Sequence, residues 1–329
     1  MKAVISLANP PTIVAMGKAS RTKQDVDRRA RVAAQREAAR RAEQRKRIYL
    51  AGGSILAVAI VVVAFVLVKL NSNGGSSASN GPTGAALTSV TKQVTGVSAS
   101  VTDGVAAGGV PNGIFASGKT ASDLSSAASN LGSFMATVDG TALTSGGKPE
   151  VLFIGGEYCP YCAAERWAMV NAFSRFGTFT GLKTTHSSST DIYPNTPTFT
   201  FVGAKYTSKY ITFTPVEEFG ATSSTILQNP TAAQQALATK YDPSGSIPFI
   251  DLGNKYVEVG NLSPLSPSMM TGKTWAQVAA AMNDPTSSLG KALVGNANYL
   301  TAATCVLTGN LPASACTPTI QKLEANLAK

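Results

Sequence analysis

The chain has 329 residues with 28 Lys and Arg against 18 Asp and Glu, a net charge of +10. Residues 1–47 hold 13 of these cations and 4 of the acids, whereas residues 70–329 carry 14 of each sign. A nucleic-acid-binding domain places its basic residues on a folded face. The neutral body offers no such stripe, so we expect no nucleic-acid partner, although the body is long enough to bury a substantial core.

The basic segment, residues 1–47, is expected to be a largely helical tail, because residues 24–47 are rich in Ala, Arg, Glu and Gln and lack Gly and Pro. Its cations can bind anionic lipid, which contributes about 1 kcal/mol per residue near a membrane surface. A charged helix that only sets topology is the alternative. Met16 is a second candidate start of the chain.

Residues 48–68 are an uninterrupted uncharged segment dominated by Ala, Val, Ile and Leu. A helix of this length spans about 30 Å, the thickness of the hydrocarbon core of a bilayer. The segment is longer than the apolar region of a cleaved signal peptide. It therefore predicts one transmembrane helix, and the cations before it predict a cytoplasmic N-terminus and an extracytoplasmic body.

The body is predicted to begin with a flexible Gly/Ser/Asn linker over residues 69–86, followed by one extracytoplasmic domain over residues 87–329. Residues 87–145 alternate small and polar positions and are interpreted as a β-containing entry to the domain. A hairpin turn is expected at residues 138–141.

The signals sharpen after Pro149, where an apolar run predicts a strand buried on both faces. The helix after it is expected to end at Gly177. Alternation of strands and helices predicts an α/β sandwich. The expected strands are residues 151–154, 182–186, 198–202 and 210–214, and the expected helices are residues 163–176 and 231–240.

The C-terminal part is predicted to contain a hairpin of residues 246–252 and 255–259, joined by a Gly253-Asn254 turn. Apolar spacing predicts a helix over residues 275–282. Two further helices are expected to flank residues 309–316, and the second opens at Thr317-Pro318.

Cys159 and Cys162 stand where the strand predicted at residues 151–154 turns into a helix. Unpaired N–H groups and the positive end of the helix dipole stabilise a thiolate at the first position. Cys159 is therefore the candidate nucleophile, with its sulfur expected to be exposed, and Cys162 the shielded resolving thiol. Pro160 has no N–H to donate, which costs nothing in a first helical turn.

Two other chemistries use similar residues. Half of a zinc site has the same Cys-x-x-Cys spacing, but the strand-to-helix context favours a redox pair, so we expect no metal. A cysteine protease needs a histidine base, and His186, the single histidine, is interpreted as an exposed structural residue on a strand.

Cys305 and Cys316 enclose a short Gly309-Asn310 turn and are predicted to form a structural disulfide worth about 3 kcal/mol. A redox relay from this pair to Cys162 is the alternative reading. All four cysteines follow residue 150, which suits an oxidising compartment.

The sequence from Val151 through Cys159-Pro-Tyr-Cys162 and the later Ser246-Ile-Pro-Phe-Ile250 resemble the thioredoxin superfamily. The tetrapeptide is similar to that of glutaredoxins. Glu157 through Trp167, with residues 193–197, more closely resembles a membrane-anchored thioredoxin-like bacterial and archaeal family of unassigned function. The resemblance implies a three-layer sandwich with an insertion and a C-terminal helical extension.

The resemblance also implies site roles. Pro248 is expected to be cis beside the cysteines and to act with them, and Ile247, Pro160 and Tyr161 are expected to contact substrate. Thioredoxins usually carry a buried acid six residues before the first cysteine, where this chain has Phe153. The base for Cys162 is thus unassigned, with Glu157 as a candidate. The insertion is expected to comprise the strands within residues 198–214.

These features lead us to expect a membrane-anchored thiol-disulfide oxidoreductase that acts on exported cysteine-containing proteins, with a membrane redox partner as a further candidate. No cofactor is expected. The direction of the reaction, as oxidase, reductase or isomerase, is left open by the sequence. The alternative is a redox-inert binding or scaffold domain with the same fold.

Overall fold

The protein is described from a computed structural model, which covers residues 81–108, 115–117, 135–260 and 265–327. The expected basic tail of residues 1–47, the transmembrane segment of residues 48–68 and linker residues 69–80 lie outside the described residues. No helix in the described part is long and apolar enough to cross a membrane. Ser79–Lys329 form one compact unit.

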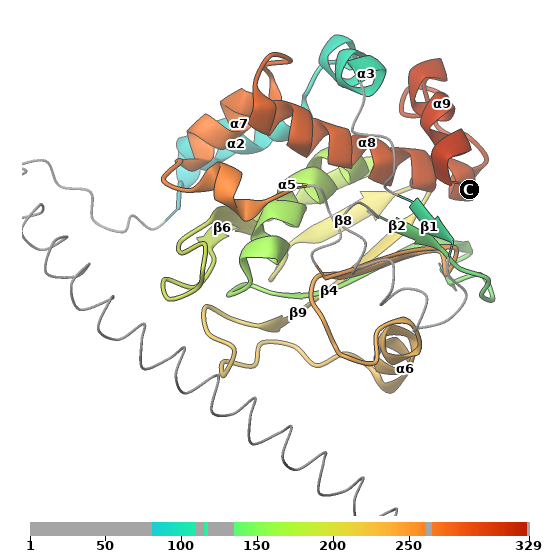
Figure 1. Ribbon diagram of the computed structural model, residues 1–329, viewed down its shortest axis with the longest axis horizontal. Helices are drawn as coiled ribbons and strands as arrows, with labels where there is room; N and C mark the ends of the chain where they lie inside the picture. Colours follow the sequence, from blue (N-terminus) through green and yellow to red (C-terminus); the bar gives the residue numbers. More distant parts are fainter. Residues whose placement is uncertain (1–80, 109–114, 118–134, 261–264, 328–329) are drawn as a thin grey trace, which may run out of the picture. The chain divides into compact units, whose positions relative to one another are not determined.

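A mixed sheet of seven strands lies at the centre of the described domain (Figure 1). Its main path runs β1 (Phe115–Ser117), β2 (Met135–Thr137), β11 (Tyr256–Val259), β10 (Phe249–Leu252), β4 (Lys148–Gly156) and β3 (Thr144–Ser145). β9 (Thr212–Phe219) pairs with β4 in parallel, whereas β10 is antiparallel to both β4 and β11.

The apolar run at the end of β4 explains its central place, because both of its faces are buried. Val151 and Phe153 face the larger core, and Leu152 and Ile154 face a second, smaller one. Side chains of a strand alternate between faces, so one continuous apolar run supplies both cores.

Helices cover both faces of the sheet (Figure 1), which confirms the expected α/β class. The smaller core receives Leu237, Ala238 and Tyr241 from α6 (Ala232–Tyr241). The larger core is closed by α2 (Gly84–Thr95), α3 (Ala99–Gly108), α5 (Pro160–Ser174), the 3₁₀ helix η1 (Pro267–Met270), α7 (Trp275–Met282), α8 (Ser288–Thr308) and α9 (Pro318–Leu327).

The structure confirms several elements that were predicted from local sequence signals. α7 has the predicted bounds, and α6 begins after Thr231, whose side chain accepts a hydrogen bond from the Gln234 N–H in a capping box. The β10–β11 hairpin turns at Gly253 and Asn254 with φ values of 68° and 55°, the left-handed conformation that a two-residue turn requires.

Other expectations were met in part or were wrong. The entry to the domain contains strands β1, β2 and β3, as expected, but it also contains helices α2 and α3, and α2 begins inside the segment expected to be linker. The hairpin turn lies at Gly146-Gly147 between β3 and β4, not at residues 138–141, because β2 pairs with β11 instead. Gly177 does not cap the helix. It opens β5, where a side chain would collide with the backbone of Thr207.

The expected insertion was also misplaced. Residues 212–214 belong to β9, the parallel partner of β4 in the central sheet. The strands outside that sheet form two small pairs: β5 (Gly177–Thr180) with β8 (Lys205–Ser208), and β6 (Lys183–His186) with β7 (Pro197–Thr200). Short strand segments could not be assigned to a sheet from local pattern alone.

Candidate active site

Cys159 is the N-cap residue of α5, in the loop that leaves β4. The backbone N–H of Cys162 donates a hydrogen bond to the Cys159 Sγ at 3.3 Å. This sulfur therefore satisfies one of the donors that a helix N-terminus leaves without an intrahelical partner. Pro160 follows as the first helical residue, where its missing N–H costs no hydrogen bond.

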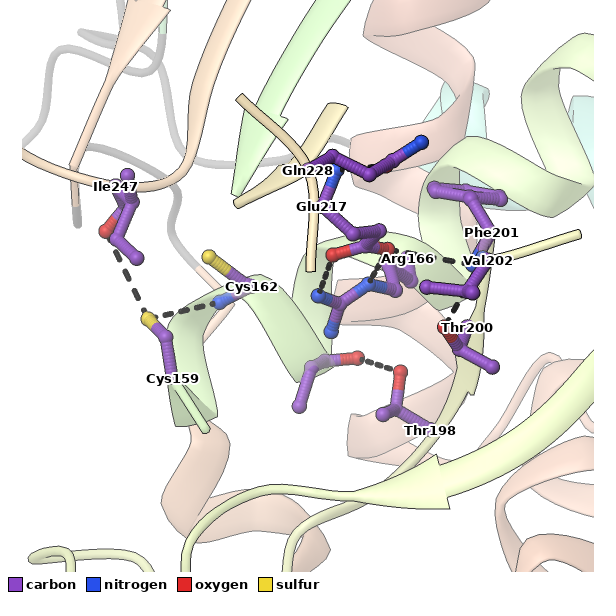
Figure 2. A network of polar contacts seen from close by, with 11 residues as sticks. Cys159, Cys162, Arg166, Thr198, Thr200, Phe201, Val202, Glu217, Gln228 and Ile247 are labelled. Carbon is purple, nitrogen blue, oxygen red and sulfur yellow. Dashed lines mark hydrogen bonds and ion pairs between the residues drawn. The ribbon is translucent and has the colours of Figure 1, made fainter. Parts of the chain in front are cut away.

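The Cys159 sulfur is less exposed than the sequence led us to expect. Cys159 is 6% exposed and Cys162 is 0% exposed, and both are free thiols. The loop before β10 covers the first thiol, because the Ile247 carbonyl oxygen lies 3.7 Å from the Cys159 Sγ (Figure 2). A partner sulfur can therefore reach Cys159 only through the small exposed fraction of this residue.

Pro248 is buried, and the Ile247–Pro248 peptide bond is cis. The structure thus brings Ile247 and Cys159 together across 88 residues of sequence. Tyr161 is half-buried, and its ring meets that of Tyr193 edge-on, with centroids 6.1 Å apart. Tyr161 and Ile247, two of the expected substrate contacts, therefore border the thiol pair on separate elements.

The two thiols differ in acidity. The hydrogen bond from the Cys162 thiol lowers the pKa of Cys159, against the opposing effect of burial, and the Cys162 N–H and the Arg166 charge add to the lowering. Burial raises the pKa of Cys162 well above its ordinary value, and hydrogen bonding to Cys159 and its charge act in the same direction. At neutral pH the first thiol carries the greater thiolate fraction.

Arg166 on α5 and Glu217 on β9 form a fully buried ion pair (Figure 2). The Arg166 Nε donates to Glu217 Oε1 at 2.8 Å, and Nη2 donates to Oε2 at 2.6 Å, a bidentate geometry. The sequence analysis did not identify this pair. An arginine on the apolar helix, four residues after Cys162, could have indicated a buried charge that needs a partner. Its partner Glu217 lies on β9, 51 residues away, and no pattern in the sequence connects the two.

The pair is held in place by its surroundings. Glu217 Oε1 also accepts a hydrogen bond from the Phe201 N–H at 3.3 Å, and the Glu217 N–H donates to Gln228 Oε1 at 2.7 Å. Phe153 occupies the place expected for an acid, and its ring lies 5.7 Å from the Arg166 guanidinium carbon. The charged groups near the thiols thus come from α5 and β9 and not from the position of Phe153.

The structure does not join Glu157 to Cys162. Glu157 is half-buried, and its backbone N–H donates to the carbonyl of Phe219 at 2.7 Å. His186 lies at the end of β6 with its Nδ1 3.0 Å from the Ser187 carbonyl oxygen. Neither residue has a recorded hydrogen bond to a cysteine thiol.

Two other buried acids, Glu165 and Glu258, interact with groups other than the cysteine thiols. Asn296 Nδ2 donates to Glu165 Oε2 at 2.6 Å, which joins α8 to α5. Burial, and then the Glu165 charge, raise the pKa of Glu258 on β11 well above its ordinary value. The described residues contain no group of three or more His, Cys, Asp or Glu side chains that could hold a metal ion.

Cys305 and Cys316 are joined in a disulfide with a Cα–Cα distance of 5.7 Å. The bridge links the last turn of α8 to the segment before α9, and the turn between them contains Gly309 and Asn310, both with positive φ. Within the described part of the chain, neither sulfur of the bridge is bonded to Cys159 or Cys162, which are both free thiols.

Comparison with protein families finds a match to "Domain of unknown function (DUF929)" over residues 134–242. The matched segment contains Cys159, Cys162, Arg166 and Glu217 and ends before Pro248 and the disulfide. Comparison with curated proteins and with solved structures gives no match. The family match therefore covers the thiol pair and the buried ion pair together.

Proposed function

We propose that the chain is a thiol-disulfide oxidoreductase in which Cys159 is the nucleophile and Cys162 the resolving thiol. The observation that carries this proposal is the unequal environment of the two thiols. Cys159 caps α5, stays slightly exposed and has a lowered pKa, whereas Cys162 is fully buried with a raised pKa. This asymmetry is what sequential attack by two thiols needs.

The order of elements supports a thioredoxin-like core for the proposal. β4, α5 and β9 form a parallel strand-helix-strand unit, and α6 then leads to the β10–β11 hairpin. The resulting strand order is β9-β4-β10-β11, with Pro248 before β10. The segment containing β5 to β8 is then the insertion, and α7 to α9 are the helical extension.

In the proposed reaction the Cys159 thiolate attacks one sulfur of a substrate disulfide, and that S–S bond breaks as the Cys159–substrate bond forms. The departing substrate sulfur leaves as a thiolate and takes a proton. Cys162 then loses its proton and attacks Cys159 Sγ, which releases the second substrate thiol and leaves a Cys159–Cys162 disulfide. The substrate gains two electrons, and the reverse sequence oxidises a dithiol.

The surface around Cys159 supports a polypeptide substrate. Ile192 is 76% exposed in a loop whose Ser188 N–H donates to the Tyr158 carbonyl, and Ile226 is 64% exposed beside Phe219, whose ring meets that of Tyr158. Exposed apolar side chains near a reactive group suit binding of apolar segments of another protein. We propose exported proteins with cysteines as substrates.

The proposal includes the membrane arrangement expected from the sequence. Residues 48–68 would anchor the domain outside the cytoplasmic membrane, and the tail of residues 1–47 would meet anionic lipid on the inner face. Turnover would then need a dithiol or disulfide partner in the membrane or in the same compartment.

The rival function is a binding domain with an inert disulfide at Cys159 and Cys162. The discriminating experiment measures the alkylation rate of each thiol against pH and the redox equilibrium of the pair with glutathione, using the full-length chain. A fast-reacting Cys159 and a bridge reduced reversibly by glutathione are expected. A bridge that resists reduction, with no difference between the two thiols, would leave only the binding function.

A further inference from the structure

The Arg166–Glu217 ion pair lies one helical turn after the resolving cysteine. Cys162 and Arg166 are separated by four residues on α5, which places their side chains on the same helix face with Cβ atoms about 5 to 6 Å apart. Both members of the pair are 0% exposed. The guanidinium charge and the Glu217 carboxylate that partly offsets it are therefore fixed near Cys162, with little screening by water.

The guanidinium is satisfied along one edge only. Nε and Nη2 donate to Glu217, whereas Nη1 is buried without a hydrogen-bond partner in the described structure. A buried ion pair is weak evidence for a stabilising role, and a buried donor without a partner counts against one. This arrangement needs a reason other than stability.

We propose that the Arg166–Glu217 pair sets the redox balance of the Cys159–Cys162 couple. Arg166 is the positioning residue that favours thiolate, and Glu217 holds it in place and offsets part of its charge. The inference rests on the proposed function, because it assigns a regulator to the same thiol site. Neither residue contacts a substrate in this role.

The acidities of the groups support this assignment. The Arg166 charge lowers the pKa of both Cys159 and Cys162, although a hydrogen bond is the largest influence on the first and burial on the second. Burial alone would lower the pKa of Arg166, but the Glu217 charge and hydrogen bonds more than reverse this effect, so Arg166 stays charged. A lower thiol pKa stabilises the reduced form and makes the couple more oxidising.

The test compares two changes to the ion pair that should shift the redox equilibrium in opposite directions. A purely structural role of the pair would not produce opposite shifts. Glu217→Gln removes the negative charge and keeps an acceptor for Arg166, whereas the double variant Arg166→Met with Glu217→Gln removes both charges and leaves no unpaired ion. Arg166→Lys keeps a cation without the bidentate geometry. Each variant is made in the full-length chain, and the pH profile of Cys159 alkylation and the equilibrium with glutathione are measured.

Opposite shifts are expected. Glu217→Gln should move the alkylation profile to lower pH and make the couple more oxidising. The double variant should move the alkylation profile to higher pH and make the couple more reducing. Each change is expected to be about three- to tenfold in the redox equilibrium constant, and tenfold corresponds to about 30 mV for a two-electron couple. Arg166→Lys should fall between wild type and the double variant.

Arg175→Met is the matched control, because Arg175 is a cation at the C-cap of α5, nine residues after Arg166 and about two and a half turns away. It donates hydrogen bonds to Asn298, Thr301 and Asn171. The control should lower the thermal unfolding midpoint without moving the pH profile. If the double variant does not fold, Glu217→Gln and Arg166→Lys still show in which direction each charge shifts the redox equilibrium.

Shifts in the same direction for Glu217→Gln and the double variant, or no shift in either, would refute the inference. That result is distinct from failure of the proposed function, which would show as a wild-type protein with no reactive Cys159 and no exchange with glutathione.

Discussion

The Cys159 Sγ lies 3.7 Å from the carbonyl oxygen of Ile247, so a residue at the start of a late hairpin covers the thiol at the start of an early helix. Despite this contact, Cys159 remains slightly exposed to solvent, whereas Cys162 is fully buried in the core. The reactivity of the motif is therefore expected to depend on which of the two sulfurs a reagent can reach.

Cys159 should alkylate at least about tenfold faster than Cys162 in the reduced protein at neutral pH, because it is the more accessible thiol and the better thiolate. Its rate should rise with pH through a pKa that is lower than that of a free cysteine. The measurement is mass-spectrometric peptide mapping after short exposure to iodoacetamide. Equal rates at the two positions would contradict the assigned roles.

Cys162→Ser should trap client proteins, because Cys159 can still attack a disulfide but the mixed disulfide cannot be resolved. Cys159→Ser should abolish exchange and trap nothing, so it is the matched control. Mixed disulfides are detected as adducts on non-reducing gels that disappear on reduction. Absence of adducts in the Cys162→Ser chain would favour the binding-domain function.

Stability should fall as pH rises from about 4 to 7 because of Asp251 on β10. Burial raises the pKa of this fully buried acid from 3.8 to about 7. The folded state then holds a proton that the unfolded state loses at lower pH, so the stabilising difference is complete below pH 3.8 and is lost toward pH 7.

Asp251→Asn should weaken this pH dependence, because Glu258, whose pKa burial also raises, still contributes in the same direction. It should raise the free energy of unfolding at pH 7 by roughly 2 to 4 kcal/mol, with little change at pH 4. Chemical denaturation at the two pH values measures the effect. Asp139→Asn, at an exposed acid, is the control and should leave the pH dependence unchanged. An Asp251→Asn chain with the same free energy of unfolding as the wild type at pH 7 would contradict the assignment.

Replacing Cys305 and Cys316 together by Ser should lower the free energy of unfolding by about 3 kcal/mol, because the bridge closes a short loop in the unfolded chain. Thiol exchange at Cys159 should persist in the variant that remains folded. Thermal denaturation and a glutathione exchange assay measure the two effects. Loss of exchange without loss of folding would instead indicate a redox relay.

External protease on intact cells should remove residues 87–329 and spare the tail, because the excess of cations before residues 48–68 predicts a cytoplasmic N-terminus. Antibodies against tags at the two ends detect the fragments. Removing the five cations at residues 40–47 should weaken this orientation. Protection of the C-terminal tag in intact cells would overturn the predicted topology and the oxidising compartment.

Features with local signals could be predicted from the amino-acid sequence alone. The apolar run of β4, the helix α6, the Gly253-Asn254 turn and the spacing of α7 follow from neighbouring residues, and so does the position of Cys159 at a helix start. Such signals depend on backbone geometry over one or two turns, which a single sequence contains.

Tertiary structure decided everything that joins distant residues. Glu217 reaches Arg166 only because β9 lies parallel to β4, and the expected insertion was misplaced because the pattern of residues 210–214 does not reveal which strand they pair with. Burial of Cys159 under Ile247 depends on the same sheet order. Strand partners and buried charge pairs are set by the packing of the whole domain, and no local pattern of residues encodes them.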